Sequence, residues 1–202
     1  SSLKRWADQG LIQVARTAGG HRRIAVSDAI RFLRESGTPV LRPDLLGLNL
    51  PNLQSPSADP TPPAELFYRL LVEGQGNEAG AWLIDRYISG VEVEALCDGP
   101  VREALARVGE LWHGDFDEGV MREHRATDVC VSALNQLRLA VEPKDATLLA
   151  IGGAPSDDPY LIPSVMAATV IASKGVRTVN LGPQSPITVL ARAVRSHAAA
   201  FA

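Results

Sequence analysis

The sequence lacks the long hydrophobic runs that mark a membrane protein. No stretch of about 18 consecutive apolar residues, the length that a membrane-spanning helix needs, occurs in the 202-residue chain. The chain also lacks a basic segment followed by an apolar one at its start, which is the pattern of a secretory signal. We therefore expect a cytoplasmic protein that has no membrane partner.

Cysteine is scarce as well. The two cysteines, Cys97 and Cys130, have neither the density of a disulfide scaffold nor the spacing of a zinc knuckle. Both lie in segments with helical periodicity, where a buried free thiol is the expected state. No pattern pairs a nucleophile with a base, so we expect no catalytic residues and no enzymatic activity.

Charge is distributed unevenly along the chain. Residues 1–38 carry seven Lys and Arg against three acids, a net charge of +4, which leaves −7 for the remainder of a chain whose total is −3. A basic end on an acidic body suggests that one module meets a polyanion. With 46% hydrophobic and 21% charged residues, the chain is otherwise typical of a globular protein and large enough for more than one compact unit.

Four segments differ in pattern and together predict a multidomain fold. Residues 1–38 indicate a helix, a short hairpin and a second helix that Gly37 ends, and residues 39–63, with seven prolines, indicate an extended linker. In residues 64–142 apolar side chains recur at intervals of three and four residues, which is typical of a bundle of about four helices. In residues 143–202 the apolar runs "TLLAIGG" and "RTVNLG" each precede a helical segment, as at the start of a doubly wound, Rossmann-like α/β layer. So short a layer predicts that the chain is trimmed at both ends, or that a partner supplies the missing sheet.

The string "RTAGGHRRI" at residues 16–24 combines cations with a Gly-Gly turn. A tight hairpin there would present Arg16 on one strand and the run from His21 to Arg23 on the other. Such a hairpin can lie along a phosphate backbone, and the preceding helix with Arg5 suits a major groove. A solvated basic face without a partner is the alternative.

The segments "LKRWADQGLI", "RTAGGHRRI" and "DAIRFL" together resemble the winged helix-turn-helix of the MerR family of transcription regulators, over about residues 1 to 36. The resemblance implies that the protein binds double-stranded DNA. The residues that it places on DNA are Arg5 in the recognition helix and Arg16, Thr17, His21, Arg22 and Arg23 in the wing. It places Trp6 and Leu11 in the small core of this unit. The first helix of the motif is missing, so we expect the chain as given to bind DNA poorly.

The stretch "WHGDFDEGVMREH" at residues 112–124 gathers an aromatic ring, two imidazoles and a carboxylate. Helical spacing predicts that Trp112 and His113 end one helix and that Glu123 and His124 begin the next, so that the four meet at one mouth of the bundle. A core Trp with surface or capping His residues is the alternative, since such residues are usually structural. A zinc site is not supported, because no third ligand stands at a recognisable spacing.

A helical bundle and an α/β unit behind a MerR-type wing resemble the CarH/LitR group of cobalamin-dependent light-sensing repressors. The resemblance implies adenosylcobalamin as cofactor, with Trp112 over its upper face and the pair Glu123 and His124 at the adenosyl group. It implies that His113 takes the cobalt after light breaks the bond between cobalt and carbon. An indole, a carboxylate and an imidazole suit a pocket of this kind. Asp157 matches the acid of the family's Asp/Glu-x-His-x-x-Gly motif.

Three positions depart from the pattern of that group. Ten residues separate Trp112 from Glu123, one more than the group's pattern has. After the first α/β strand, Pro159 stands where the lower-ligand His is expected, and Ile162 replaces the Gly beside the nucleotide tail. Proline cannot ligate a metal, and an Ile crowds the path of the tail. By this resemblance, the sequence has the residues expected at the upper face of the cofactor. It lacks the lower ligand and the glycine beside the nucleotide tail.

Two hypotheses of function remain open from the sequence. The first is a DNA-binding repressor whose cobalamin-type sensor responds to light or to the cofactor through formation of a homo-oligomer. The second is a paralogue that does not use the cofactor, in which the sensor half serves oligomerisation or binds another ligand. A corrinoid-carrying enzyme subunit is not expected, because the lower His is missing and a DNA-binding module is attached.

Overall fold

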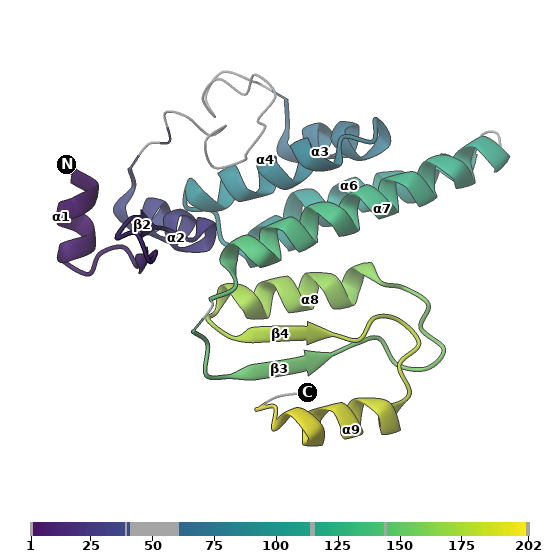
Figure 1. Ribbon diagram of the computed structural model, residues 1–202. Coiled ribbons are helices and arrows are strands. Elements are labelled where there is room, and N and C mark those ends of the chain that lie inside the picture. The colour runs from purple at the N-terminus through teal and green to yellow at the C-terminus, as the bar shows by residue number, and fades with distance from the viewer. Residues whose placement is uncertain (1, 39, 41–60, 114–115, 144, 201–202) are drawn as a thin grey trace.

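The computed structural model shows a mostly helical molecule with two small sheets (Figure 1). It describes residues 2–38, 40, 61–113, 116–143 and 145–200. Most of the predicted linker therefore lies outside the described residues. The order of the parts agrees with the helical bundle and small α/β region that the sequence predicts. No helix in the described part of the chain has the length and apolar content that crossing a membrane requires.

The N-terminal unit consists of two helices and a hairpin. Its elements are α1 (Ser2–Asp8), β1 (Ala15–Arg16), β2 (Arg22–Arg23) and α2 (Val26–Ser36). Gly37 ends α2 as predicted, with a left-handed φ of 60° that residues other than glycine rarely adopt. The Trp6 ring lies 4.8 Å from the Phe32 ring, between centroids, and joins α1 to α2.

The prediction that Leu11 belongs to this small core is wrong. Leu11 is 55% exposed, and Ile12 is buried instead. Leu11 lies outside α1, which ends at Asp8, and the chain there turns Ile12 inward instead.

Residues 63 to 141 form the helical bundle. Its elements are α3 (Pro63–Val72), α4 (Gly76–Ile88), α5 (Val93–Leu96), η2 (Cys97–Val101), α6 (Arg102–Gly109), η3 (Glu110–His113) and α7 (Phe116–Val141). Apolar side chains that recur at three and four positions turn one face of each longer helix inward. Among the fully buried members of this core are Phe67, Leu71, Leu83, Val93, Leu134 and Leu137.

The "DGP" sequence at residues 98–100 kinks the chain between two helices. Such a Gly-Pro pair predicts a break between helices. In the structure the π-helical turn η2 carries the chain from α5 into α6, with Pro100 inside it and Gly99 in a non-helical conformation. Proline offers no N–H for a regular helical hydrogen bond, and a π turn is one way in which a helix accommodates such a defect.

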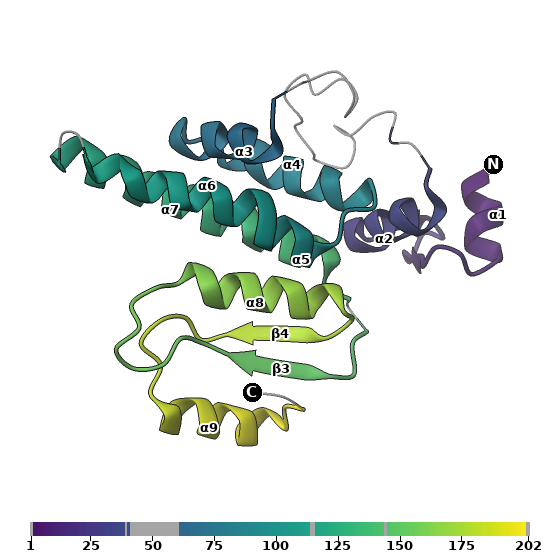
Figure 2. The ribbon, with the colours of Figure 1, turned by 180° about the vertical axis from the view of Figure 1, so that it is seen from behind.

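The α/β unit has a strand, a helix, a second strand and a second helix, in the order that the sequence predicts. The elements are β3 (Leu149–Gly152), α8 (Ile162–Ser173), β4 (Arg177–Asn180) and α9 (Ile187–His197). The strands are parallel, with Leu149 opposite Arg177 and Gly152 opposite Asn180. Figures 1 and 2 show α8 between the sheet and α7, and α9 on the other side of the sheet.

Helix α2 packs on the bundle as well as on α1. Ile30 is fully buried and belongs to the same core as Phe67 and Leu134. α2 contacts both α4 and α7, and it lies beside the C-terminal end of α7 (Figure 1). Side-chain packing therefore joins the N-terminal unit to the bundle.

Candidate functional site

The β1–β2 hairpin has the geometry that the sequence predicts for residues 16 to 23. Its strands are antiparallel, with Arg16 opposite Arg22. Two hydrogen bonds close the turn: the Thr17 N–H donates to the His21 carbonyl at 2.9 Å, and the His21 N–H donates to Thr17 Oγ1 at 3.1 Å. Gly20, at a φ of 78°, supplies the left-handed residue of the turn.

The six residues predicted to contact DNA fall into two groups. Arg5, Arg16, His21 and Arg23 are exposed. The other two have structural partners, because Thr17 closes the turn and Arg22 Nη2 lies 2.7 Å from Asp8 Oδ1 of α1. The ion pair of Arg22 thus ties the hairpin to α1 and leaves the exposed arginines to meet a partner.

The turn η3 carries Trp112 and His113 at the tip of the bundle. Trp112 is 50% exposed and meets Phe116 edge-on, with ring centroids 6.3 Å apart. His113 Nε2 lies 3.0 Å from Glu110 Oε2, and the His113 side chain is exposed. Two aromatic rings and an imidazole at one surface suit a flat, largely apolar ligand that also makes a polar or metal contact.

Gly119, in the first turns of α7, positions this surface. A Cβ at Gly119 would overlap the Leu111 carbonyl oxygen and lie 3.2 Å from the Trp112 Cα. The missing side chain therefore lets η3 lie directly on α7. Sequence reasoning missed both Gly119 and Phe116. A glycine inside a helical segment was the available signal, since it costs about 1 kcal/mol relative to Ala and often marks a close approach.

The prediction that Glu123 and His124 begin a helix is wrong, because α7 starts well before them and places them about two turns inside it. Glu123 is partly buried and accepts a hydrogen bond from Thr127 Oγ1 at 2.8 Å. Gly119 and Glu123 stand four residues apart, so Glu123 shares the face of α7 on which η3 lies. His124 is exposed on a neighbouring face, with its Nε2 3.5 Å from Glu123 Oε2.

Asp157 lies in the α/β unit, in the loop after β3, whereas the other four predicted cofactor residues lie in the bundle. It is exposed and has a φ of 76°. Pro159 follows in the same loop and offers no side-chain ligand. This loop is bonded to the loop after β4: the Ala154 N–H donates to the Gly182 carbonyl at 2.9 Å, and the Ser185 N–H donates to the Ala154 carbonyl at 2.8 Å. At the carboxyl edge of the sheet, where open α/β sheets bind ligands, backbone hydrogen bonds thus join the two loops to each other.

The chemistry of these residues can be compared with what a cobalamin requires. Trp112 and Phe116 offer ring surfaces, and His113 offers an imidazole nitrogen. Pro159 cannot serve as a lower ligand. Among the described residues, no three His, Cys, Asp or Glu side chains are grouped so that they could hold a metal ion. The ring and imidazole side chains have the chemistry for one face of such a cofactor, and position 159 offers no lower ligand for the other face.

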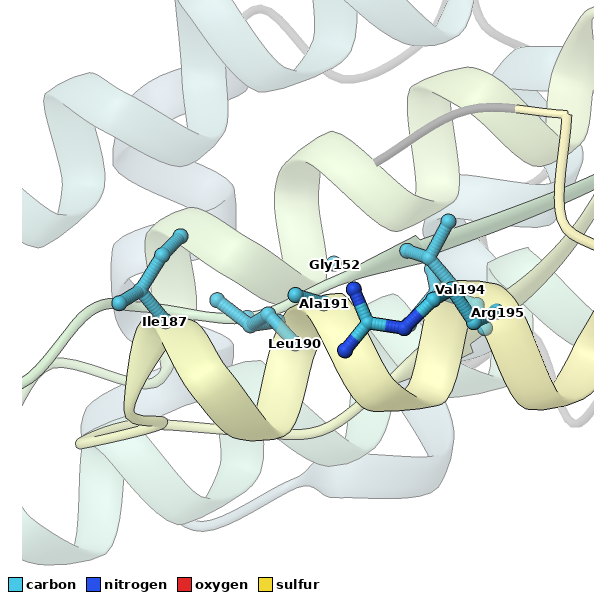
Figure 3. A pocket seen from close by; sticks show the side chains of 8 residues that line it. Gly152, Ile187, Leu190, Ala191, Val194 and Arg195 are labelled. Atoms are coloured by element: carbon cyan, nitrogen blue, oxygen red, sulfur yellow. The ribbon is translucent and has the colours of Figure 1, made fainter.

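An apolar groove of about 440 Å³ lies between α9 and β3 (Figure 3). The side chains and glycines that line it include Ile151, Gly152, Ile187, Leu190, Val194 and Arg195. No residue of α9 is buried, although the apolar residues of this helix recur at three and four positions. The groove therefore leaves part of the apolar side of α9 uncovered where this helix faces β3.

Comparison with known proteins adds no relative. No family model matches the chain, and no curated protein matches it. The functional conclusion therefore rests on the residues and their geometry.

Proposed function

We propose that the protein is a DNA-binding transcription regulator, a repressor, whose bundle and α/β unit form a cobalamin-type sensor. One observation carries the DNA-binding part: Arg16 and Arg23 are exposed on a tight hairpin that an ion pair ties to α1, where Arg5 is exposed too. Exposed cations on a hairpin can contact phosphates, and a basic helix beside it can enter a groove. The resemblance of this unit to the MerR wing supports the same interpretation.

The DNA-binding part is tested by anisotropy titrations of a labelled duplex at several salt concentrations. The double variant Arg16→Ala, Arg23→Ala should bind every duplex sequence more weakly. The slope of log affinity against log salt should flatten by about 0.9 for each phosphate that the variant no longer neutralises. Arg102→Ala, which removes an exposed Arg of α6, is the control and should bind as the parent does. Equal affinities of parent and double variant at all salt concentrations would exclude binding through the hairpin.

The sensor part is supported by the aromatic surface at the tip of the bundle. Adenosylcobalamin, when bound, supplies a bond that light breaks. If it binds here, Trp112 and Phe116 would cover one face of the ligand and keep water from it. Glu123 would accept hydrogen bonds from the adenosyl group, and His113 would present its imidazole beside Trp112.

We propose further that the sensor acts through the oligomeric state of the chain. Several hairpins in one homo-oligomer bind neighbouring DNA sites with an avidity that one hairpin lacks. A ligand or light that shifts the assembly then changes the affinity for DNA without changing the hairpin itself. Size-exclusion chromatography combined with titration of operator DNA tests this step, and equal affinity of single and assembled chains would contradict it.

The second candidate function is a regulator whose sensor half does not use cobalamin. Pro159, which stands where a lower-ligand His is expected, favours it. To decide, the protein is mixed with adenosylcobalamin in the dark and freed of unbound ligand, and its visible spectrum is recorded before and after green light. A corrin spectrum retained by the parent and by Leu139→Ala, but absent in Trp112→Ala, supports the cobalamin sensor; Leu139 is an exposed apolar residue elsewhere on α7. A colourless parent selects the second function.

A further inference from the structure

Helix α2 packs on two partners through opposite faces. Phe32 lies against Trp6 of α1, whereas Ile30 is buried in the bundle core. Positions two apart on a helix differ by about 200° around its axis, so the two side chains face nearly opposite directions. The helix is thus a wall shared by the N-terminal unit and the bundle, and a contact that fixes α2 on the bundle also fixes the direction of the hairpin.

Arg34, one turn after Ile30, fixes α2 at the end of α4. Its Nη1 donates to the carbonyl oxygens of Tyr87 and Val91, the latter at 3.0 Å. Its guanidinium carbon lies 4.2 Å from the centroid of the Tyr87 ring, and the side chain is only 17% exposed. The last carbonyls of a helix have no partner within it, and a cation is favourable there. Arg34 therefore caps α4 from a different unit of the molecule.

Glu92, in the link between α4 and α5, contacts cations from two other units. Its Oε1 accepts a hydrogen bond from Arg34 Nη2, and its Oε2 lies 3.7 Å from Lys174 Nζ. Lys174 follows α8 in the α/β unit, and its Nζ also lies 2.6 Å from Glu94 Oε1. That hydrogen bond lowers the pKa of Glu94 and so favours its charged form.

The two contacts of Glu92 differ in strength. Arg34 is mostly buried and bound by three oxygens and a ring, an arrangement that Lys cannot reproduce. Lys174 is 53% exposed, and exposed ion pairs at this separation are weak and screened by salt. The hold of Arg34 is therefore firm, whereas the ion pair with Lys174 can form and break at little cost.

We infer that Arg34 is a positioning residue that fixes the N-terminal unit on the bundle, and that Glu92, shared with Lys174, couples this position to the α/β unit. A displacement of the end of α8 moves the Lys174 ammonium relative to Glu92. The hydrogen bond between Glu92 and Arg34 then changes in strength. Any effect of this contact on how the hairpin meets DNA rests on the proposed function. The contact of Arg34 with α4 and Glu92 does not rest on it, because the experiments below measure that contact without DNA.

Spin-label distances test the positioning. Labels at Ala18→Cys in the hairpin and Ala106→Cys on α6, both exposed positions, report how the N-terminal unit lies on the bundle. Arg34→Ala should broaden the distance distribution, and Arg34→Lys should restore it only in part. Arg31→Ala is the matched control, because this Arg of α2 pairs with Asp28 of the same helix. An unchanged distribution in Arg34→Ala overturns the positioning role.

Hydrogen exchange of the α2 amides in the full chain tests the coupling. Lys174→Ala should speed their exchange by about two- to fivefold, the effect expected from removal of a weak exposed pair. The same substitution should have no further effect in Glu92→Gln. Glu94→Gln is the control, since it removes the other partner of Lys174 and leaves Glu92 in place. If Lys174→Ala leaves the α2 amides unchanged, or acts equally in Glu92→Gln, the coupling is wrong.

Discussion

A single missing side chain lets the turn that carries Trp112 lie directly on α7. Gly119 faces the Leu111 carbonyl and the Trp112 backbone at a distance that admits no Cβ. Gly119 therefore helps to position the rings of Trp112 and Phe116, although it has no side chain that could bind a ligand. At this scale the sequence shows which side chains can bind a ligand, but not which glycine positions them, because that depends on a contact between two elements.

Gly119→Ala should lower the free energy of unfolding and move Trp112. Overpacking typically costs about 1–3 kcal/mol, which exceeds the roughly 1 kcal/mol that Ala gains over Gly in a helix. Urea titration measures the first effect, and acrylamide quenching of Trp fluorescence measures the second. Gly109→Ala is the control, since a Cβ there meets no atom within 4 Å. If both variants unfold at the same urea concentration, the contact of η3 with α7 is not tight.

The two buried cysteines should resist thiol reagents in the folded protein. Burial raises the pKa of Cys97 and of Cys130 to about 12, so both stay protonated and unreactive at pH 8. Their folded pKa exceeds the unfolded value, so the stability they contribute is present below pH 9 and is lost as the pH rises towards 12. Ellman's reagent should label neither thiol in buffer and both in guanidinium. Rapid labelling of the native chain would contradict this burial.

At the scale of elements, the helices and strands follow from apolar periodicity, and their mutual arrangement does not. The strand–helix order after residue 147 and the end of α2 at Gly37 are visible in the sequence. The two packing faces of α2 are not, because Ile30 and Phe32 look alike until both partners are known. The "DGP" sequence at residues 98–100 does show where the chain departs from a regular helix, since Gly99 is non-helical there.

Ile30→Ala should destabilise the bundle although Ile30 belongs to the N-terminal unit. The side chain is fully buried in the bundle core, and truncation of a buried Ile costs about 2–5 kcal/mol. Val26→Ala on the same helix is the control, because Val26 is 53% exposed and a surface change usually stays within about 0.5 kcal/mol. Chemical unfolding followed by helical circular dichroism measures both. A bundle that unfolds alike in parent and Ile30→Ala would show that α2 folds independently of it.

At the scale of the whole molecule, the α/β unit meets the bundle through the packing of α8 on α7 and through the ion pairs of Lys174 with Glu92 and Glu94. The cation and the two acids come from segments about 80 residues apart in the sequence, so no local sequence pattern predicts that they are in contact. What the sequence does show is the uneven charge along the chain. The structure adds that Arg34, a cation of the basic segment, is used to hold the units together.

Acid should weaken this junction. The hydrogen bond from Lys174 lowers the pKa of Glu94 from its ordinary 4.5. Because the folded value lies below the unfolded one, the stabilisation is present above pH 4.5 and is lost as the pH falls through the folded value. The difference in stability between the parent and Glu94→Gln should therefore shrink as the pH falls from 7 to 3 in denaturant titrations. High salt should also reduce it, since the pair is exposed. A difference that is independent of pH would assign the effect to another contact.

Helix α7 has a mechanical consequence for the molecule as a whole. Its 26 residues form a rod about 39 Å long, with the Trp112 surface at one end and α2 beside the other (Figure 1). α7 packs on α4 and α8 as well as on α2, so a displacement at one of its ends must move those helices too. The helix is therefore a strut that the three parts of the molecule share, and not an arm that swings freely.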